Sequence, residues 1–418
     1  MATATRKKSR QDNQRERREA LISAGLKVVA RHGYTKASVN RITNAAGLAQ
    51  GTLYSYFGSH EKFLNQLLPE EGMRFFRFLD QNAAETGDYF EDQRLRFLAI
   101  SRYLQRNRYF LRVMTDAECA VPESYAQHMS NVEERYLRDQ YAAQAAGQIR
   151  PFDDTEHRVI AEIQAGAVGH IALGFGGRPA ETGSGIPEWA ADTYVRFFRD
   201  GLASRMADLS QVPVPGDRTV FRPQFHGTRE RLLEAAARVV MARGFSGTNV
   251  ASIAQEAGLS VGALYKHFDS QQELFDLLID HVRVAMLDHV REFTHGAKTF
   301  VEREYRGFHA FFDFLTTSPW YIRVESEAAV WTPKTYNRHF FDLADSYVIL
   351  LRRAQASGEL EGYEDRELPV LAYILMAARH YIAARYVPAD GSARHLPPHV
   401  VSTYLALLQR GMSLHNDL

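Results

Sequence analysis

The 418-residue chain contains a single cysteine, Cys119, and so cannot form an internal disulfide. Chains without disulfides are typical of a reducing compartment, so we expect a cytoplasmic protein in which Cys119 is a small buried hydrophobic residue. The sequence has no apolar run approaching the roughly 20 residues that a membrane helix needs. The polar, basic segment Met1–Arg18 has no apolar stretch that could act as a signal peptide. These absences argue against a membrane or secreted protein.

The chain also lacks an excess of either charge, because 50 Lys and Arg balance 50 Asp and Glu. This balance excludes a uniformly basic coat for nucleic acid but allows a local basic surface. Motifs for catalysis are missing as well. We find no phosphate-binding glycine loop, no nucleophile elbow and no cysteine-rich or closely spaced histidine set. We therefore expect no enzymatic activity, no cofactor and no metal site.

What the sequence does contain is an internal repeat. A shift of 211 residues aligns Arg18–Leu68 with Arg229–Ile279 without a gap, and 18 of these 51 positions are identical. The same shift holds far downstream, where Gln144 falls on Gln355, Gly147 on Gly358 and Pro187 on Pro398. The period is much longer than that of a solenoid, so each copy should have its own core. The chain is predicted to be a tandem duplication of one whole protomer.

Between the copies lies a proline-containing segment, which is typical of a linker because proline removes backbone donors and stiffens the chain. We divide the chain into a basic tail (1–14), a first helix-turn-helix domain (15–68), a first helical C-terminal domain (69–207), a linker (208–226), a second helix-turn-helix domain (227–280) and a second helical C-terminal domain (281–418).

Each copy has the apolar periodicity of helices throughout. The first helix should end near Gly33, or near Gly244 in the second copy. Short helices are then expected at 39–46 and 250–257, capped by Ser38 or by Thr248 and Asn249. The next glycines, Gly47 and Gly258, should adopt a positive φ before second short helices at 50–56 and 261–267. Such a pair of short helices forms a helix-turn-helix, whose second helix can enter the DNA major groove.

The motif residues resemble a known family. Both copies are similar to the N-terminal domain of the tetracycline-repressor (TetR) family. In the first copy the resemblance rests on Gly33-Tyr34…Val39…Ile42…Ala46-Gly47-Leu48…Gly51-Thr52-Leu53-Tyr54-Ser55-Tyr56-Phe57. In the second it rests on Gly244-Phe245…Val250…Ile253-Ala254…Ala257-Gly258-Leu259-Ser260…Gly262-Ala263-Leu264-Tyr265-Lys266-His267-Phe268. The resemblance implies an all-α protein made of two tandem TetR-like protomers. Each protomer would join a DNA-binding domain to a helical domain for ligand binding and dimerisation. It also implies a repressor that leaves DNA when a small molecule binds.

The resemblance places the base-reading positions on Gln50 and Thr52 in the first copy and on Val261 and Ala263 in the second. Gln can form a bidentate pair with adenine, whereas Val and Ala offer only apolar contact. The phosphate-positioning roles fall on nine residues, each of which could instead be a solvated polar side chain: Ser38, Arg41, Tyr54, Tyr56, Thr248, Asn249, Tyr265, Lys266 and His267.

The two heads differ in other respects. The lysine that the family carries at the start of the fourth helix is replaced by His60 and Gln271, and Ala37 replaces the usual threonine. From Arg15 to Leu68 there are eight basic and three acidic residues, a balance of +5, whereas His226–Ile279 has five and six, a balance of −1. Because duplex affinity depends on phosphate neutralisation, the first head should bind more tightly. The basic tail is either a minor-groove arm or a solvated terminus.

A fused pair with diverged heads does not require a perfectly palindromic site. We expect one chain to act as a monomeric pseudo-dimer on an imperfect palindrome of double-stranded DNA, with higher homo-oligomers as an alternative. Small residues in the penultimate helices should pack the copies together, or else pack within one copy: Ala161, Ala165, Gly166, Gly169, Ala172, Ala377, Ala378, Ala383 and Ala384.

A pocket for an apolar or aromatic effector is a further expectation for the C-terminal domains. Its candidate residues are Tyr103, Phe110, Tyr125, His128, Phe312, Trp320, Trp331, Tyr336 and His339, although aromatic residues at helical spacing more often form a core. The alternative function is a small-molecule-binding helical protein whose DNA binding is degenerate or absent. Neither the operator nor the effector can be read from the sequence.

Overall fold

The computed structural model describes residues 10–107, 109–176, 185–202, 209, 212, 227–318, 320–387 and 396–414. Within these ranges all regular secondary structure is helical, which confirms the all-α prediction. Residues 10–14, which we had assigned to the tail, begin the first helix. The rest of the tail and nearly all of the linker lie outside the described residues.

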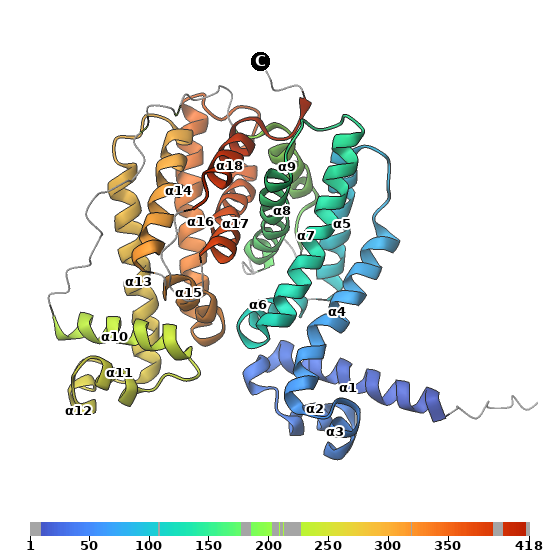
Figure 1. Ribbon diagram of the computed structural model, residues 1–418, viewed down its shortest axis with the longest axis vertical. Coiled ribbons are helices and arrows are strands. Elements are labelled where there is room, and N and C mark those ends of the chain that lie inside the picture. Colours follow the sequence, from blue (N-terminus) through green and yellow to red (C-terminus); the bar gives the residue numbers. More distant parts are fainter. Residues whose placement is uncertain are drawn as a thin grey trace, which may run out of the picture. The chain divides into compact units, whose positions relative to one another are not determined.

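The first copy contains α1 (Arg10–His32), η1 (Tyr34–Lys36), α2 (Val39–Ala46), α3 (Gln50–Phe57), α4 (His60–Asn82), α5 (Tyr89–Arg106), α6 (Phe110–Ala120), α7 (Pro122–Ala145), α8 (Asp154–Gly176) and α9 (Glu188–Asp200). The second contains α10 (Thr228–Arg243), α11 (Val250–Glu256), α12 (Val261–Leu264), α13 (Gln271–Thr294), α14 (Phe300–Thr317), α15 (Trp320–Trp331), α16 (Pro333–Ala356), η2 (Asp365–Glu367), α17 (Leu368–Tyr386) and α18 (Pro398–Arg410). Figure 1 shows this repeated order along the colour gradient.

The chain divides into two compact units, which do not coincide with the two copies. One unit comprises Met1–Ala83 and Ala99–Asn131 and contains the first DNA-binding domain. The other comprises Ala84–Leu98 and Val132–Leu418, so it joins α8, α9 and parts of α5 and α7 of the first copy to the whole second copy. The packing between the copies therefore belongs to this second unit.

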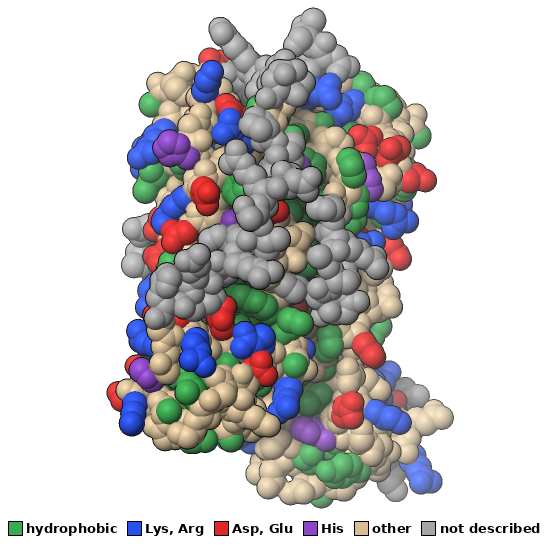
Figure 2. Space-filling model, turned by 60° about the vertical axis from the view of Figure 1, so that its left-hand side comes forward, with side chains coloured by type: hydrophobic (Ala, Val, Ile, Leu, Met, Phe, Trp, Pro, Cys, Tyr) green, Lys and Arg blue, Asp and Glu red, His purple; other side chains and the backbone are tan. Residues whose placement is uncertain are grey.

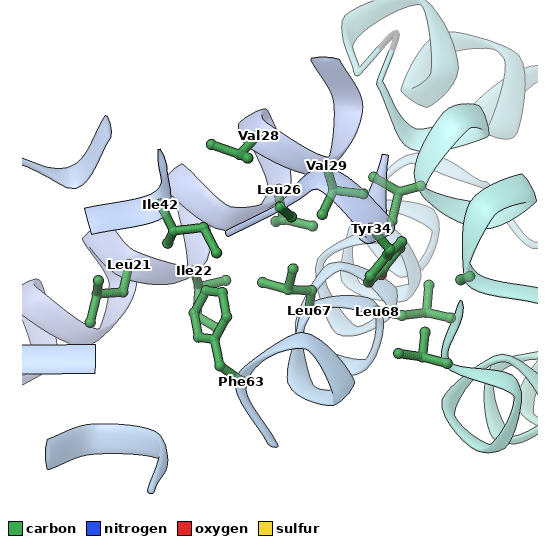
Figure 3. Packing of buried hydrophobic residues seen from close by; sticks show 14 of the residues in the cluster. Leu21, Ile22, Leu26, Val28, Val29, Tyr34, Ile42, Phe63, Leu67 and Leu68 are labelled. Carbon is green, nitrogen blue, oxygen red and sulfur yellow. The ribbon is translucent and has the colours of Figure 1, made fainter. Parts of the chain in front are cut away.

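The first DNA-binding domain is built around one apolar core. Leu21, Ile22 and Leu26 of α1 face Phe63 and Leu67 of α4, as Figure 3 shows. The predicted caps of α2 are confirmed, because the Ser38 hydroxyl accepts a hydrogen bond from the backbone N–H of Arg41 and Gly47 has φ 65°. These two residues fix both ends of α2, and the helix runs over the predicted 39–46.

The second DNA-binding domain departs from the prediction in one helix. We expected a helix over 261–267, but α12 ends at Leu264 and is followed by turns. The physical reason lies after the helix. Gly58 closes α3 with φ 76° and donates its backbone N–H to Tyr54, whereas the equivalent residue in the second copy is Asp269. An aspartate adopts this left-handed conformation far less readily than glycine, so the second helix frays earlier.

A four-helix bundle joins the copies. α8 packs along α17, and α9 and α18 complete the bundle. At its end, Leu202 N–H donates to the carbonyl of Leu408 (2.7 Å), and Met412 N–H donates to the carbonyl of Phe198 (2.8 Å). These two bonds are equivalent under exchange of the copies. Of the small residues predicted to pack between the copies, Gly166 of α8 lies against Tyr381 of α17.

We had extended the gapless shift of 211 residues to the last helix, and this prediction was wrong. Pro187 caps α9, and its structural counterpart before α18 is Pro397 rather than Pro398. The glycines that follow these helices agree with this shorter shift. Gly201 is the C-cap of α9 and Gly411 is the C-cap of α18, with φ 75° and 62°. The second copy is therefore one residue shorter than the first between its penultimate and last helices.

Two other expectations need correction. By length and composition α8 is apolar enough to cross a membrane, although we had expected no such segment. However, 78% of its apolar stretch is buried inside the protein, as in the core helix of a soluble bundle. Cys119 is only partly buried rather than a core residue.

Candidate nucleic-acid interface and effector cavity

The second helix of the first head presents a polar face. Gln50 and Tyr54 are exposed, Thr52 and Tyr56 are half-buried, and Leu53 points into the core. The Gln50 side-chain amide donates to the Asn40 side chain of α2, which sequence reasoning had not singled out. This contact holds Gln50 at the start of α3, where a reading helix meets base edges.

Around α3, the predicted phosphate-positioning residues are partly engaged in the fold. Ser38 caps α2, and the exposed Arg41 guanidinium donates to the backbone carbonyl of Lys36 (2.7 Å). Lys36 is itself exposed and was not among our candidates. Together Lys36 and Arg41 place two cationic side chains next to the helix-turn-helix.

The second head exposes a less polar reading face. Val261 is 37% exposed and Tyr265 is 50% exposed, Lys266 and His267 are exposed, and Ala263 is half-buried. Asn249 is engaged as the cap of α11. The seventh candidate, Thr248, is only 3% exposed, and its hydroxyl donates to the carbonyl of Gly244 (2.6 Å). Burial therefore removes the Thr248 side chain from the surface, and its role here is to stabilise the turn.

The departures from the family pattern have a structural explanation. A ring nitrogen of His60 lies 2.7 Å from the carbonyl oxygen of Ala37, and the Gln271 amide donates to the carbonyl of Thr248 (2.9 Å). These are equivalent positions in the two copies. Both residues therefore tie the start of the fourth helix to the turn that precedes the helix-turn-helix.

A glycine in each reading helix has no packing role. A Cβ added to Gly51 would meet nothing within 4 Å, and one added to Gly262 would meet only the Ser260 hydroxyl at 3.9 Å. Glycine inside a helix costs about 1 kcal/mol relative to alanine. An unneeded glycine at the same place in both heads favours close approach of another molecule to the backbone.

The surface charge is mixed rather than of one sign. On the face shown in Figure 2, Lys and Arg side chains alternate with Asp and Glu. The +5 balance of the first head is therefore a local feature of a neutral protein. A local cluster is what phosphate contacts require.

In the first C-terminal domain, the candidate ligand residues form a filled core. Tyr103 donates its hydroxyl to the buried Glu71 carboxylate (2.5 Å), and the Phe110 ring stacks on Phe75 with centroids 5.2 Å apart. His128 is 4% exposed and stacks on Phe76. Tyr125 packs against the core of the first head. These four candidates are therefore side chains of the interior.

The burial of His128 makes stability depend on pH. Burial lowers the pKa of His128 from its usual 6.5 to about 4, so the ring is neutral in the folded protein. A lowered pKa stabilises the fold above about pH 6.5, and this contribution is lost as the pH falls towards 4. We expect a loss of about 3 kcal/mol over that range. Urea unfolding should show a flatter pH dependence for His128→Gln, and an unchanged profile would contradict the assignment.

The second C-terminal domain contains a cavity of about 70 Å³. Two of our candidates, Tyr336 and His339, line it together with a second tyrosine, Tyr321. Three other candidates do not line the cavity. The Phe312 ring packs at an angle against the rings of Phe308 and Phe311. Trp331 lies parallel to Phe245 of the second head, and Trp320 is half-buried at the start of α15. Sequence reasoning missed the remaining cavity residues, which are His170, Ile279, Val282, Arg283, Met286, Val324, Glu325, Phe340, Leu343, Met376 and His380.

Different side chains occupy the equivalent positions of the first copy. Phe75 replaces Met286, and Phe110 replaces Tyr321. Gly72 replaces Arg283, and the space beside it is taken by His128, whose Nδ1 lies 2.7 Å from where a Cβ would stand. The two copies have therefore diverged from a common layout at the positions that line the cavity of the second copy. A residue-by-residue comparison of the copies could have found this difference.

The cavity is connected to the second head through α15. Tyr321 and Val324 line the cavity on one face of this helix. On the other, Arg323 donates to the carbonyl of Met241 (2.6 Å), and the Glu327 carboxylate accepts the backbone N–H of Phe245 (2.6 Å). The first copy repeats this arrangement with the Arg112–Asp116 pair beside Gly33. One helix therefore touches both the cavity and the turn that leads into the DNA-binding motif.

A larger hollow of about 580 Å³ in the second unit is lined by charged side chains. Those charges already pair with one another, since Arg94 contacts Asp192 at 2.5 Å and Arg196 contacts Glu367. An effector would have to displace these ion pairs. This hollow is therefore a poorer binding site than its size suggests.

Comparison with known proteins agrees with this layout. The family model described as "Bacterial regulatory proteins, tetR family" matches residues 21–67 and again residues 232–278. The transcriptional repressor KstR of Mycobacterium tuberculosis is 32% identical over 154 residues, which is 36% of this chain and 68% of KstR. KstR of Mycolicibacterium smegmatis is also 32% identical over 154 residues, 74% of its length. The chain belongs to the tetR family, with the DNA-binding domain present twice.

Solved structures of the same family are similar to parts of the chain. The regulator FadR from Bacillus subtilis, solved in complex with stearoyl-CoA, has a TM-score of 0.39 and 18% identity, and the match covers 44% of this chain and 98% of FadR. A TetR family regulator from Marinobacter aquaeolei has a TM-score of 0.38 and 22% identity, covering 44% and 96%. Each match spans about one copy.

Proposed function

We propose that this protein is a cytoplasmic, non-enzymatic repressor in which one chain supplies both DNA-reading heads. The repeat of the helix-turn-helix is the observation that carries the proposal, supported by the exposed Gln50 and Tyr54 on α3 and by the paired glycines Gly51 and Gly262. The four-helix bundle between the copies takes the place of the dimer interface of a one-copy regulator. The chain then reads an imperfect palindrome with heads about one helical turn apart.

The test of DNA binding is a titration of the chain's own upstream promoter fragment against random DNA at several salt concentrations. A specific regulator binds the promoter fragment at least about a thousandfold more tightly than random sequence. Equal affinity for the two would instead favour the alternative, a small-molecule-binding protein without operator recognition. A footprint with two protected half-sites of unequal strength would further support one chain with two unequal heads.

The effector acts, in this proposal, through the cavity of the second copy. Its walls combine apolar side chains with the polar groups of His339 and Arg283, so they suit an apolar or aromatic molecule that carries a polar group. The cavity is smaller than the 300 Å³ or more of a typical ligand site, so binding has to push its walls apart. Displacement of α15 would then pull on Phe245 through Glu327 and turn the second head away from its groove.

The substitution Met286→Phe tests this site, because it introduces the ring that fills the first copy. We expect operator binding to persist while release by an active metabolite, found by screening, is lost or weakened at least about tenfold. The matched control is Met73→Phe, at a methionine that is 54% exposed. If Met286→Phe and Met73→Phe respond alike to the metabolite, the effector binds elsewhere.

A further inference from the structure

The bundle between the copies contains contacts that have no equivalent under exchange of the two copies. α8 and α17 run antiparallel, and each step of four residues along α8 is matched by four residues back along α17. In this register Glu162 faces Arg385, Gly166 faces Tyr381 and Gly174 faces Tyr373. Under the 211-residue shift Gly174 corresponds to Arg385, and Glu162 corresponds to Tyr373. The Gly174–Tyr373 and Glu162–Arg385 contacts therefore occupy equivalent positions but are made by different side chains.

Two of the contacts depend on glycine. A Cβ added to Gly166 would lie 2.2 Å from a ring carbon of Tyr381, and one added to Gly174 would lie 2.1 Å from a ring carbon of Tyr373. Such distances are far below van der Waals contact, so each ring lies directly on the α8 backbone. The second copy has Ala377 where the first has Gly166. A pair of second copies in the same register would therefore drive Tyr381 into the Ala377 methyl.

The third contact depends on charge. Arg385 Nε lies 3.0 Å from the Glu162 carboxylate, which is 3% exposed, and its guanidinium also lies 3.5 Å from Glu133. A pair of first copies would place Glu162 opposite Gly174, so each of the two buried carboxylates would lose the arginine that contacts it across the bundle. An unpaired buried charge is strongly destabilising.

We propose that α8 and α17 form a pairing code that accepts one first copy and one second copy and rejects two of the same kind. Two chains therefore do not combine through two first copies or through two second copies, and the two halves of one chain pair with each other because the covalent link keeps them at a high effective concentration. This inference rests on the proposed two-headed function and adds the orientation of the chain on the operator. A strong head is always paired with a weak one, so the operator is read with a fixed polarity.

The glycine contacts are tested by thermal unfolding of the full chain. Gly166→Ala and Gly174→Ala should each lower the unfolding midpoint by about 3–10 °C, and adding Tyr381→Ala to Gly166→Ala should recover part of that loss. The matched control on the same helix is Gly169→Ala, whose Cβ would lie 3.6 Å from the Tyr381 hydroxyl, an ordinary contact. A loss in the control as large as in Gly166→Ala would overturn the proposal.

The charge contact is tested with Glu162→Arg and Arg385→Glu. Each alone should lower the midpoint, and the double variant should regain at least about half of the summed loss, because the ion pair is restored with reversed sign. Additive losses would overturn this part of the code.

Pairing between chains is tested by co-expressing two differently tagged full chains. Capture of one tag should bring down none of the other, and the purified protein should have the mass of a single chain, 47.5 kDa. Co-capture of the second tag would refute intrachain pairing while leaving operator binding, measured separately, intact.

Discussion

Alanine at Gln50 or Tyr54 should weaken operator binding about 10- to 100-fold, whereas alanine at Tyr265 should weaken it less than about threefold. Gln50 is held by Asn40 at the start of a two-turn helix, so its amide is already oriented when DNA arrives. Tyr265 follows a helix of one turn in a head whose net charge is −1. Fluorescence anisotropy with the promoter fragment measures these affinities.

Two controls accompany this comparison. The unfolding midpoints of all three variants should match the wild type, since Gln50, Tyr54 and Tyr265 are exposed. Arg41→Ala should weaken binding at every sequence and reduce the salt dependence of log K by about one ion, because Arg41 is expected to contact phosphate rather than bases. If Gln50→Ala and Tyr265→Ala lose equal affinity, the two heads contribute equally and the charge argument is wrong.

Local signals were enough to predict the helix-turn-helix. Ser38 and Gly47 supply a cap and a left-handed residue, and each acts on its own neighbours, so the bounds of α2 follow from a few residues. Ser59 and Ser270 act on their neighbours in the same way, because their side chains cap α4 and α13. Such short-range interactions depend little on the rest of the fold.

The errors arose where the sequence allowed two answers. Pro397 and Pro398 are adjacent, so a proline matched Pro187 under either shift, and only the pairing of Gly201 with Gly411 across the bundle selects the shorter one. The early end of α12 had a readable signal, the replacement of Gly58 by Asp269. We overlooked it because the repeat itself suggested equal helices.

The cavity could not be predicted from periodicity, because it depends on volumes contributed by distant segments. Met286 of α13, Tyr321 of α15 and Tyr336 of α16 meet only in the folded bundle. Aromatic residues at helical spacing look alike whether they fill a core, as Phe110 does, or line an opening, as Tyr321 does. The internal duplication supplies what periodicity lacks, because each position has a counterpart for comparison.

The second large effect concerns a buried ion pair found only in the second copy. The Arg379 guanidinium donates to the Glu304 carboxylate (3.0 Å), which also accepts the Tyr404 hydroxyl (2.7 Å). Glu304 is 3% exposed. Removing one partner leaves a buried charge unpaired, so Arg379→Val should lower the free energy of unfolding by about 3–5 kcal/mol. The matched control is Arg352→Ala, whose ion pair with Asp365 is exposed and should contribute less than about 1 kcal/mol.

The first copy carries no charge at these two positions, and the ion pair of Arg96 with Asp139 lies beside Gln93 instead. Val168 and Gln93 occupy the positions of Arg379 and Glu304 there. The double variant Arg379→Val with Glu304→Gln copies that solution, because the amide keeps an acceptor for Tyr404 and no charge remains. We therefore expect it to be more stable than Arg379→Val alone, by about 1 kcal/mol or more in urea unfolding. A double variant as unstable as the single one would mean that the loss comes from the missing arginine packing rather than from an unpaired carboxylate.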